Sequence, residues 1–94
     1  MSLEQLRQKI DKLDIALVEL LNERAKISLQ ILQEKQKSDA LVYNQKREQQ
    51  VIQNVTQENN GPLTSEHIRS IFQQIIESCR NLQHSQKGNE QWSL

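Results

Sequence analysis

An apolar stripe with the period of an α-helix runs through the N-terminal part of the chain. Its members are three or four residues apart, except where a polar residue stands at position 24, and they are Leu3, Leu6, Ile10, Leu13, Leu17, Leu20, Ile27 and Ile31. No glycine or proline interrupts residues 2–38, so we expect one helix, about 50 Å long at a rise of 1.5 Å per residue. A compact chain of 94 residues has a radius of gyration of only about 12 Å. The helix must therefore extend beyond its own chain, and its stripe predicts a homodimer in which a partner chain covers it.

The composition favours the same conclusion, because a small domain often depends on disulfides, metals or oligomerisation for its stability. The single cysteine, Cys79, excludes an internal disulfide, and His67 and His84 have no partners at metal-ligand spacing. Twelve Lys and Arg residues balance twelve Asp and Glu residues, so the charge indicates neither nucleic acid nor an anionic membrane. No apolar run approaches the roughly 20 residues of a membrane span, and no secretory segment is evident. We expect a cytoplasmic protein that binds neither nucleic acid nor membrane.

Two shorter helices are expected to follow the long one. The apolar period breaks at about residues 37–44, and residues 45 to about 59 are typical of a second helix. The run Asn59-Asn60-Gly61-Pro62 predicts a turn, after which Thr64 or Ser65 can cap a third helix. The apolar residues of the second helix are Val51, Ile52 and Val55. Those of the third helix, close to an ideal 3.6-residue pattern, are Ile68, Ile71, Phe72, Ile75, Ile76, Cys79 and Leu82.

The predicted fold class is therefore all-α, with one helical domain at residues 1–83. Residues 84–94 are polar and have no helical period. We expect them to form a mobile tail in which Trp92 is an isolated surface aromatic.

Three polar residues occupy positions on these apolar faces. Arg24 stands where the first stripe requires an apolar residue. It is either a ligand-binding residue or a structural arginine that extends its charged end to solvent or pairs with a carboxylate of another helix. Lys35 lies eleven residues later on nearly the same face, so the two cations can converge on one ligand from about 16 Å apart. Gln83, which extends the third apolar face, needs hydrogen-bond partners and can also be a core glutamine or part of a frayed end. This pattern predicts a cationic pocket for a small anionic ligand.

Arg7 presents a geometric difficulty. It precedes Arg24 by 17 residues, which places it about 25 Å away and about a quarter of the helix circumference round. It cannot reach the same ligand within one chain, although an antiparallel partner helix could bring a second copy of it there. Spacing alone favours the alternative, an ion pair with Asp11 one turn later.

The start of the second helix carries further candidates. Arg47 and Glu48 are by default solvated charges, and Asn44 is a natural N-cap. Cys79 is most simply a small buried apolar residue.

In order and spacing, four segments resemble the all-helical chorismate mutases: LRQKIDKLDIALVELLNERAKI, EKQK, VYNQKRE and IFQQIIESCRNLQ. The resemblance covers about residues 3–83. It implies an intertwined homodimer of three-helix chains with two shared sites. The implied reaction is the rearrangement of chorismate to prephenate in phenylalanine and tyrosine biosynthesis, an isomerisation that uses no cofactor or metal.

The resemblance also implies the catalytic roles. Arg7 of the partner chain and Arg24 would grip the two carboxylates of chorismate. Lys35 and Gln83 would donate hydrogen bonds to the ether oxygen whose bond to the ring breaks.

At the other end of the substrate, Glu48 would accept a hydrogen bond from the ring hydroxyl, with Arg47 and Asn44 shaping that end. The family usually has an aspartate at the position of Asn44. It commonly has a serine or another small residue at the position of Cys79, which the resemblance places among the substrate-binding residues. Arg80 stands where an aliphatic residue is frequent and could add positive charge at the pocket rim.

Two alternatives stay open. An isochorismate-pyruvate lyase on the same fold would have a similar cationic site, although lyases resembling this family tend to lack the carboxylate of Glu48. A non-catalytic helical dimer or regulatory module would leave Arg24 and Gln83 unexplained.

Overall fold

The computed structural model describes the backbone of residues 1–37 and 44–92, and their side chains except those of 36–37 and 86–92. It contains three helices, α1 (Leu3–Lys37), α2 (Gln45–Glu58) and α3 (Ser65–Trp92), and no strand in the described residues. The all-α class and the starts of the three helices are confirmed. The predicted break before α2 falls largely on residues 38–43, which lie outside the described residues.

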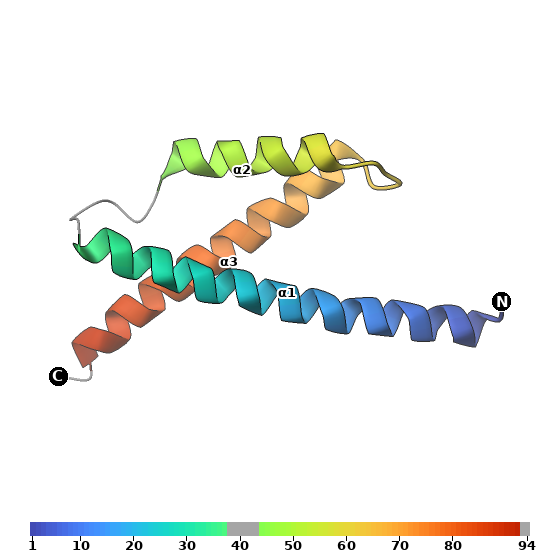
Figure 1. Ribbon diagram of the computed structural model, residues 1–94, viewed down its shortest axis with the longest axis horizontal. Helices are drawn as coiled ribbons and strands as arrows, with labels where there is room; N and C mark the ends of the chain where they lie inside the picture. Colours follow the sequence, from blue (N-terminus) through green and yellow to red (C-terminus); the bar gives the residue numbers. More distant parts are fainter. Residues whose placement is uncertain (38–43, 93–94) are drawn as a thin grey trace.

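The three helices are arranged around α3 (Figure 1). This helix packs against both α1 and α2, whereas the described residues of α1 and α2 do not pack against each other. It crosses α1 in the C-terminal half of α1, and the N-terminal half, drawn in blue, extends away from the other helices. The molecule measures 55 × 30 × 16 Å and has a radius of gyration of 16.8 Å, well above the roughly 12 Å of a compact chain of this length.

The apolar stripe of α1 is largely uncovered in the single chain. Leu3, Leu13 and Leu20 are each more than 60% exposed, at 63%, 64% and 62%. Among the residues whose side chains are described, the buried apolar ones are Leu32 and Cys79. An apolar surface this continuous is typical of an interaction site. No helix in residues 1–37 or 44–92 has the length and apolar character needed to cross a membrane.

Each helix begins at a side-chain cap that satisfies backbone N–H groups of its first turn. At α1 the Ser2 hydroxyl accepts from the Gln5 N–H at 3.1 Å, and the Gln5 carboxamide accepts from the Ser2 N–H at 2.9 Å. This reciprocal pair is a capping box. Asn44 caps α2 by accepting a hydrogen bond from the Arg47 N–H at 3.0 Å, as the sequence predicted.

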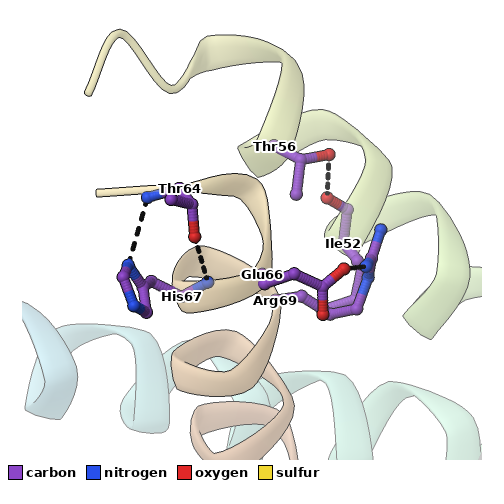
Figure 2. A network of polar contacts seen from close by, with 6 residues as sticks. All are labelled: Ile52, Thr56, Thr64, Glu66, His67 and Arg69. Atoms are coloured by element: carbon purple, nitrogen blue, oxygen red, sulfur yellow. Dashed lines mark hydrogen bonds and ion pairs between the residues drawn. The ribbon is translucent and has the colours of Figure 1, made fainter. Parts of the chain in front are cut away.

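The cap of α3 is also reciprocal (Figure 2). The Thr64 hydroxyl accepts from the His67 N–H, and the His67 Nδ1 accepts from the Thr64 N–H, both at 3.2 Å. Of the two residues proposed as the cap, the structure therefore selects Thr64 over Ser65. His67, to which the sequence assigned no role, is the second half of this cap. Glu66, in the first turn of α3, forms an ion pair with Arg69 at 2.6 Å.

The turn between α2 and α3 is where the sequence predicted it. Gly61 has a φ of 77°, a left-handed conformation that favours glycine. The Asn59 side chain spans the turn, since its amide donates to the Leu63 carbonyl at 2.7 Å and its oxygen accepts from the Gly61 N–H at 3.1 Å. These bonds hold the turn that connects α2 to α3.

Helix α3 continues for nine residues beyond the predicted domain boundary at Gln83, to Trp92. The loss of apolar period at residue 84, from which the sequence predicts a polar tail, does not end the helix. Extending an existing helix costs little where strong helix breakers are lacking, and residues 84–87 (His-Ser-Gln-Lys) contain neither glycine nor proline. The mobility of residues 84–94 and the exposure of Trp92 stay predictions.

Replacing Thr64 with Ala should lower the free energy of unfolding by about 1 kcal/mol, because the His67 N–H loses its acceptor. Ser65→Ala is the matched control, and we expect a change within about 0.5 kcal/mol for it. Urea unfolding of the three proteins at one protein concentration measures both values. Equal losses for the two variants would contradict the assignment of Thr64 as the cap.

Candidate active site

A cavity of about 600 Å³ lies where the C-terminal half of α1, the start of α2 and the second half of α3 face one another. Its size is within the range of small-molecule sites. Seven of the eight predicted site residues line it: Arg24, Lys35, Asn44, Arg47, Glu48, Cys79 and Gln83. The structure thus brings together residues from three helices that the sequence selected separately.

The described lining of this cavity is strongly cationic. It includes five cationic side chains and one carboxylate, that of Glu48. The cations are Arg24, Lys35, Lys46, Arg47 and Arg80. Isoleucine and valine side chains supply apolar surface between them, so charge-assisted hydrogen bonds to an anion would form beside a low-dielectric wall. The cavity is suited to a small anion with an apolar body.

Arg24 connects α1 to α3. It is half-buried, and its Nη1 donates to the Cys79 Sγ at 3.2 Å. A thiol sulfur is a weak acceptor and engages one of the five guanidinium N–H donors. The alternative of an ion pair is not seen, since Arg24 pairs with no carboxylate among the described side chains of residues 1–35 and 44–85. Cys79 itself is buried, as its apolar position predicted.

Gln83 makes the second link between α1 and α3. It is buried, and its Nε2 donates to the backbone carbonyl of Ser28 at 2.7 Å. The hydrogen-bond partner that a core glutamine requires is therefore present. A carboxamide has two N–H donors and one acceptor oxygen, so this bond orients the group and leaves a second N–H for a ligand. The structural role and the predicted catalytic role are compatible.

Lys35 is half-buried and lines the same cavity as Arg24. Both cations of α1 line one cavity, and their convergence on one ligand stays a prediction. They approach the cavity from two ends of the same helical face, three turns apart.

The α2 side of the cavity is organised by the helix start. Asn44 is both the N-cap and a lining residue, and the Arg47 Nη1 donates to Gln50 Oε1 at 3.0 Å. The Glu48 Oε2 lies 3.4 Å from the Arg80 Nη1, an ion pair that joins α2 to α3. Positive charge from Arg80 at the rim was expected, but its pairing with Glu48 was not.

Arg7 is the predicted site residue that the single chain does not bring to the cavity. It is exposed on the outlying half of α1. The competing prediction, an ion pair with Asp11, is not seen between these two described residues. Its role across a dimer interface stays a prediction.

Three polar lining residues were missed by sequence reasoning. Ser28, Lys46 and Gln50 line the cavity, and Ser28 is 8% exposed. A signal for Ser28 existed, because it lies four residues after Arg24 and therefore on the same face of α1. No comparable signal separated Lys46 and Gln50 from other polar residues of α2.

The described fold and the cavity define a class: all-helical proteins with a cavity lined by cationic side chains. The family described as chorismate mutase type II matches residues 6–84, and the chain belongs to this family.

Solved structures agree with this assignment. A structure of chorismate mutase (form II) from Thermus thermophilus superposes with a TM-score of 0.84, at 28% identity over 86% of this chain and 92% of that chain. Form I from the same organism gives a TM-score of 0.79, at 29% identity over 81% of this chain and 95% of that chain.

Curated relatives are longer proteins. A bifunctional chorismate mutase/prephenate dehydratase of Stutzerimonas stutzeri is 33% identical over 86 residues, which is 86% of this chain and 24% of the relative. A protein of the same name from Pseudomonas aeruginosa is 33% identical over 90 residues, 90% of this chain and 25% of the relative. The chain thus spans about a quarter of the length of these relatives.

Asn44→Asp should leave the free energy of unfolding nearly unchanged, because a carboxylate oxygen accepts the Arg47 N–H as well as an amide oxygen does. Asn44→Ala should lower it by about 1 kcal/mol, because that N–H then loses its cap. Urea unfolding at one protein concentration compares the two variants with the parent. An alanine variant as stable as the parent would contradict the capping role of Asn44.

Proposed function

We propose that this chain is a chorismate mutase, an isomerase that rearranges chorismate to prephenate in phenylalanine and tyrosine biosynthesis. The observation that carries the proposal is the meeting of Arg24, Lys35, Glu48 and Gln83 in one cavity of a family member. The reaction is intramolecular and moves no atom to or from the protein. The protein contributes by holding the substrate in its reactive conformer and by stabilising the charge that develops as bonds change.

Arg24 grips one carboxylate of chorismate in this mechanism. Its contact with Cys79 holds the guanidinium at the cavity wall and engages one of its five N–H donors, so the others can bind a carboxylate. The partner's Arg7 grips the other carboxylate. Two guanidinium–carboxylate contacts at opposite ends restrict the side chain that must fold over the ring, which is the main entropic cost of the reaction.

Lys35 and Gln83 act on the ether oxygen. Negative charge grows on this oxygen as its bond to the ring lengthens, so donors aimed at it stabilise the transition state more than the substrate. The Ser28 carbonyl holds the Gln83 amide in place before the substrate binds. Little reorganisation is then needed during the reaction.

Glu48 accepts a hydrogen bond from the ring hydroxyl. Arg47 and Asn44 shape this end through the first turn of α2, since the Asn44 cap orders the backbone that carries Glu48. Cys79, one turn before Gln83 on α3, forms the part of the cavity wall that the Arg24 guanidinium contacts.

We infer that the active form is an intertwined homodimer. The exposed stripe of α1 supports this, because burying apolar surface contributes about 25 cal/mol per Å². In such a dimer the outlying half of one α1 lies along the other chain. Arg7, which is remote from the cavity of its own chain, then completes the cavity of the partner.

An assay of the purified chain with chorismate and, separately, isochorismate tests the proposed function. Prephenate formed from chorismate is the expected result. Release of pyruvate from isochorismate without mutase activity would assign the lyase reaction instead. Inactivity on both substrates, with the protein folded by circular dichroism, would support a non-catalytic helical dimer and overturn the proposal.

The Gln83→Glu variant should lose activity as pH rises, because the introduced carboxyl can donate a hydrogen bond only while protonated. Its single proton is also shared with the Ser28 carbonyl, so even in acid its kcat/KM should stay below that of the parent. The parent should vary little between about pH 5 and 8, since an amide has no proton to lose in that range.

Activity profiles of the two proteins across this range check the prediction. Circular dichroism at each pH corrects the rates for any unfolded fraction, since burying the carboxylate beside the carbonyl also destabilises the fold. A Gln83→Glu profile as flat as that of the parent would remove Gln83 from the mechanism and leave it a structural core residue.

A further inference from the structure

An ion pair between Arg80 and Glu48 joins α3 to α2 beside the cavity. The Arg80 Nη1 and the Glu48 Oε2 are 3.4 Å apart, and the two side chains are 31% and 26% exposed. Partial burial reduces solvent screening of the pair compared with an exposed one. A charge pair at this depth can hold a side chain in one orientation.

The pair lies between two cavities. Glu48, Ile76 and Arg80 line the cavity described above and also a second one of about 540 Å³ between α2 and α3. Arg80 and Glu48 therefore form part of the wall that separates the two cavities. The Arg80 Nη1 contacts the Glu48 Oε2, and an ionised carboxylate has about four acceptor positions on its two oxygens. The Glu48 Oε1 remains for a second donor.

The charge of Glu48 requires compensation. It is the carboxylate in the described lining of a cavity that we propose for a dianion, and like charges close together in a partly buried site repel. Arg24 and Lys35 are the cations of the lining that we propose to bind the substrate, whereas Arg80 is paired with Glu48 itself. A cation at this position lowers the repulsion and keeps the carboxylate available as an acceptor.

We propose that Arg80 is a positioning residue, which fixes Glu48 so that its second oxygen accepts the ring hydroxyl of the substrate. The inference rests on the proposed function and deepens it. An aliphatic residue is frequent at the position of Arg80 in the family that the sequence resembles. The positioning role of Arg80 is therefore a feature of this chain and not of the family as a whole. Arg80 acts through Glu48 and need not contact the substrate.

A double-mutant cycle tests the inference. Arg80→Leu should lower kcat/KM for chorismate about tenfold when Glu48 is present, because the carboxylate loses its anchor and its charge compensation. In the Glu48→Gln background the same change should lower kcat/KM less than about twofold, since there is no carboxylate left to position. Arg80→Lys keeps the charge and should recover part of the loss, which a purely structural role would not predict.

Arg69→Leu is the matched control. Arg69 is another arginine of α3 paired with a glutamate, Glu66, and it lines only the second cavity. We expect its kcat/KM to match that of the parent. Rates are expressed per folded protein from circular dichroism, and if Arg80→Leu does not fold, Arg80→Gln takes its place in the cycle.

Equal losses in both Glu48 backgrounds would overturn the inference, because Arg80 would then act on the substrate directly. An unchanged kcat/KM for Arg80→Leu with Glu48 present would also overturn it, because the ion pair would then not contribute to catalysis. Both results differ from failure of the proposed function, in which the parent itself shows no mutase activity.

Discussion

The apolar face of α1 is the constraint on which the rest of the structure depends. α3 crosses and packs against the C-terminal half of this helix and leaves the N-terminal half without a partner from its own chain (Figure 1). Leu32 and Cys79 are the buried apolar residues among the described side chains, so a single copy has almost no core. A domain of this size with so little interior needs another source of stability. The proposed homodimer supplies it, and the same interface would bring Arg7 to a cavity that one chain leaves incomplete.

The candidate site depends equally on α3, because this helix contacts both of the others while α1 and α2 do not pack together in the described residues. Gln83 of α3 donates a hydrogen bond to the Ser28 carbonyl of α1, and Cys79 of α3 accepts one from Arg24 of α1. Arg80 joins α3 to α2 through Glu48. Each link uses a residue that also lines the cavity. Stability of the helix packing and geometry of the proposed catalytic groups therefore rest on the same few contacts.

Much of the fold could be predicted because its signals are local. The stripe of α1, the cap at Asn44 and the turn at Gly61 each depend on residues within a few positions of one another. Arg24 and Gln83 were recognised because they interrupt or extend apolar faces, a conflict between local pattern and residue type that is expected at functional sites.

The remaining features depend on how the helices cross, which no local pattern specifies. The Arg80–Glu48 pair joins residues 32 positions apart, and the Gln83–Ser28 bond joins residues 55 positions apart. The choice between Thr64 and Ser65, and the role of His67, depended on the backbone geometry of one turn. The extension of α3 to Trp92 was missed because a helix needs no apolar face where it leaves the packed region. Lys46 and Gln50 could not be told from other polar residues until α2 was placed beside α1 and α3.

The central claim is that each site is built by two chains, with Arg24 from one and Arg7 from the other. Mixing two inactive dimers, one carrying Arg7→Ala and one carrying Arg24→Ala, tests it most directly. After subunit exchange, every heterodimer keeps one site with both arginines and loses both from the other site. Random exchange should then restore about a quarter of the parent activity, because half of the dimers are heterodimers with one intact site of two. If exchange is verified by mass spectrometry and no activity returns, Arg7 does not act across the interface and the shared site is contradicted.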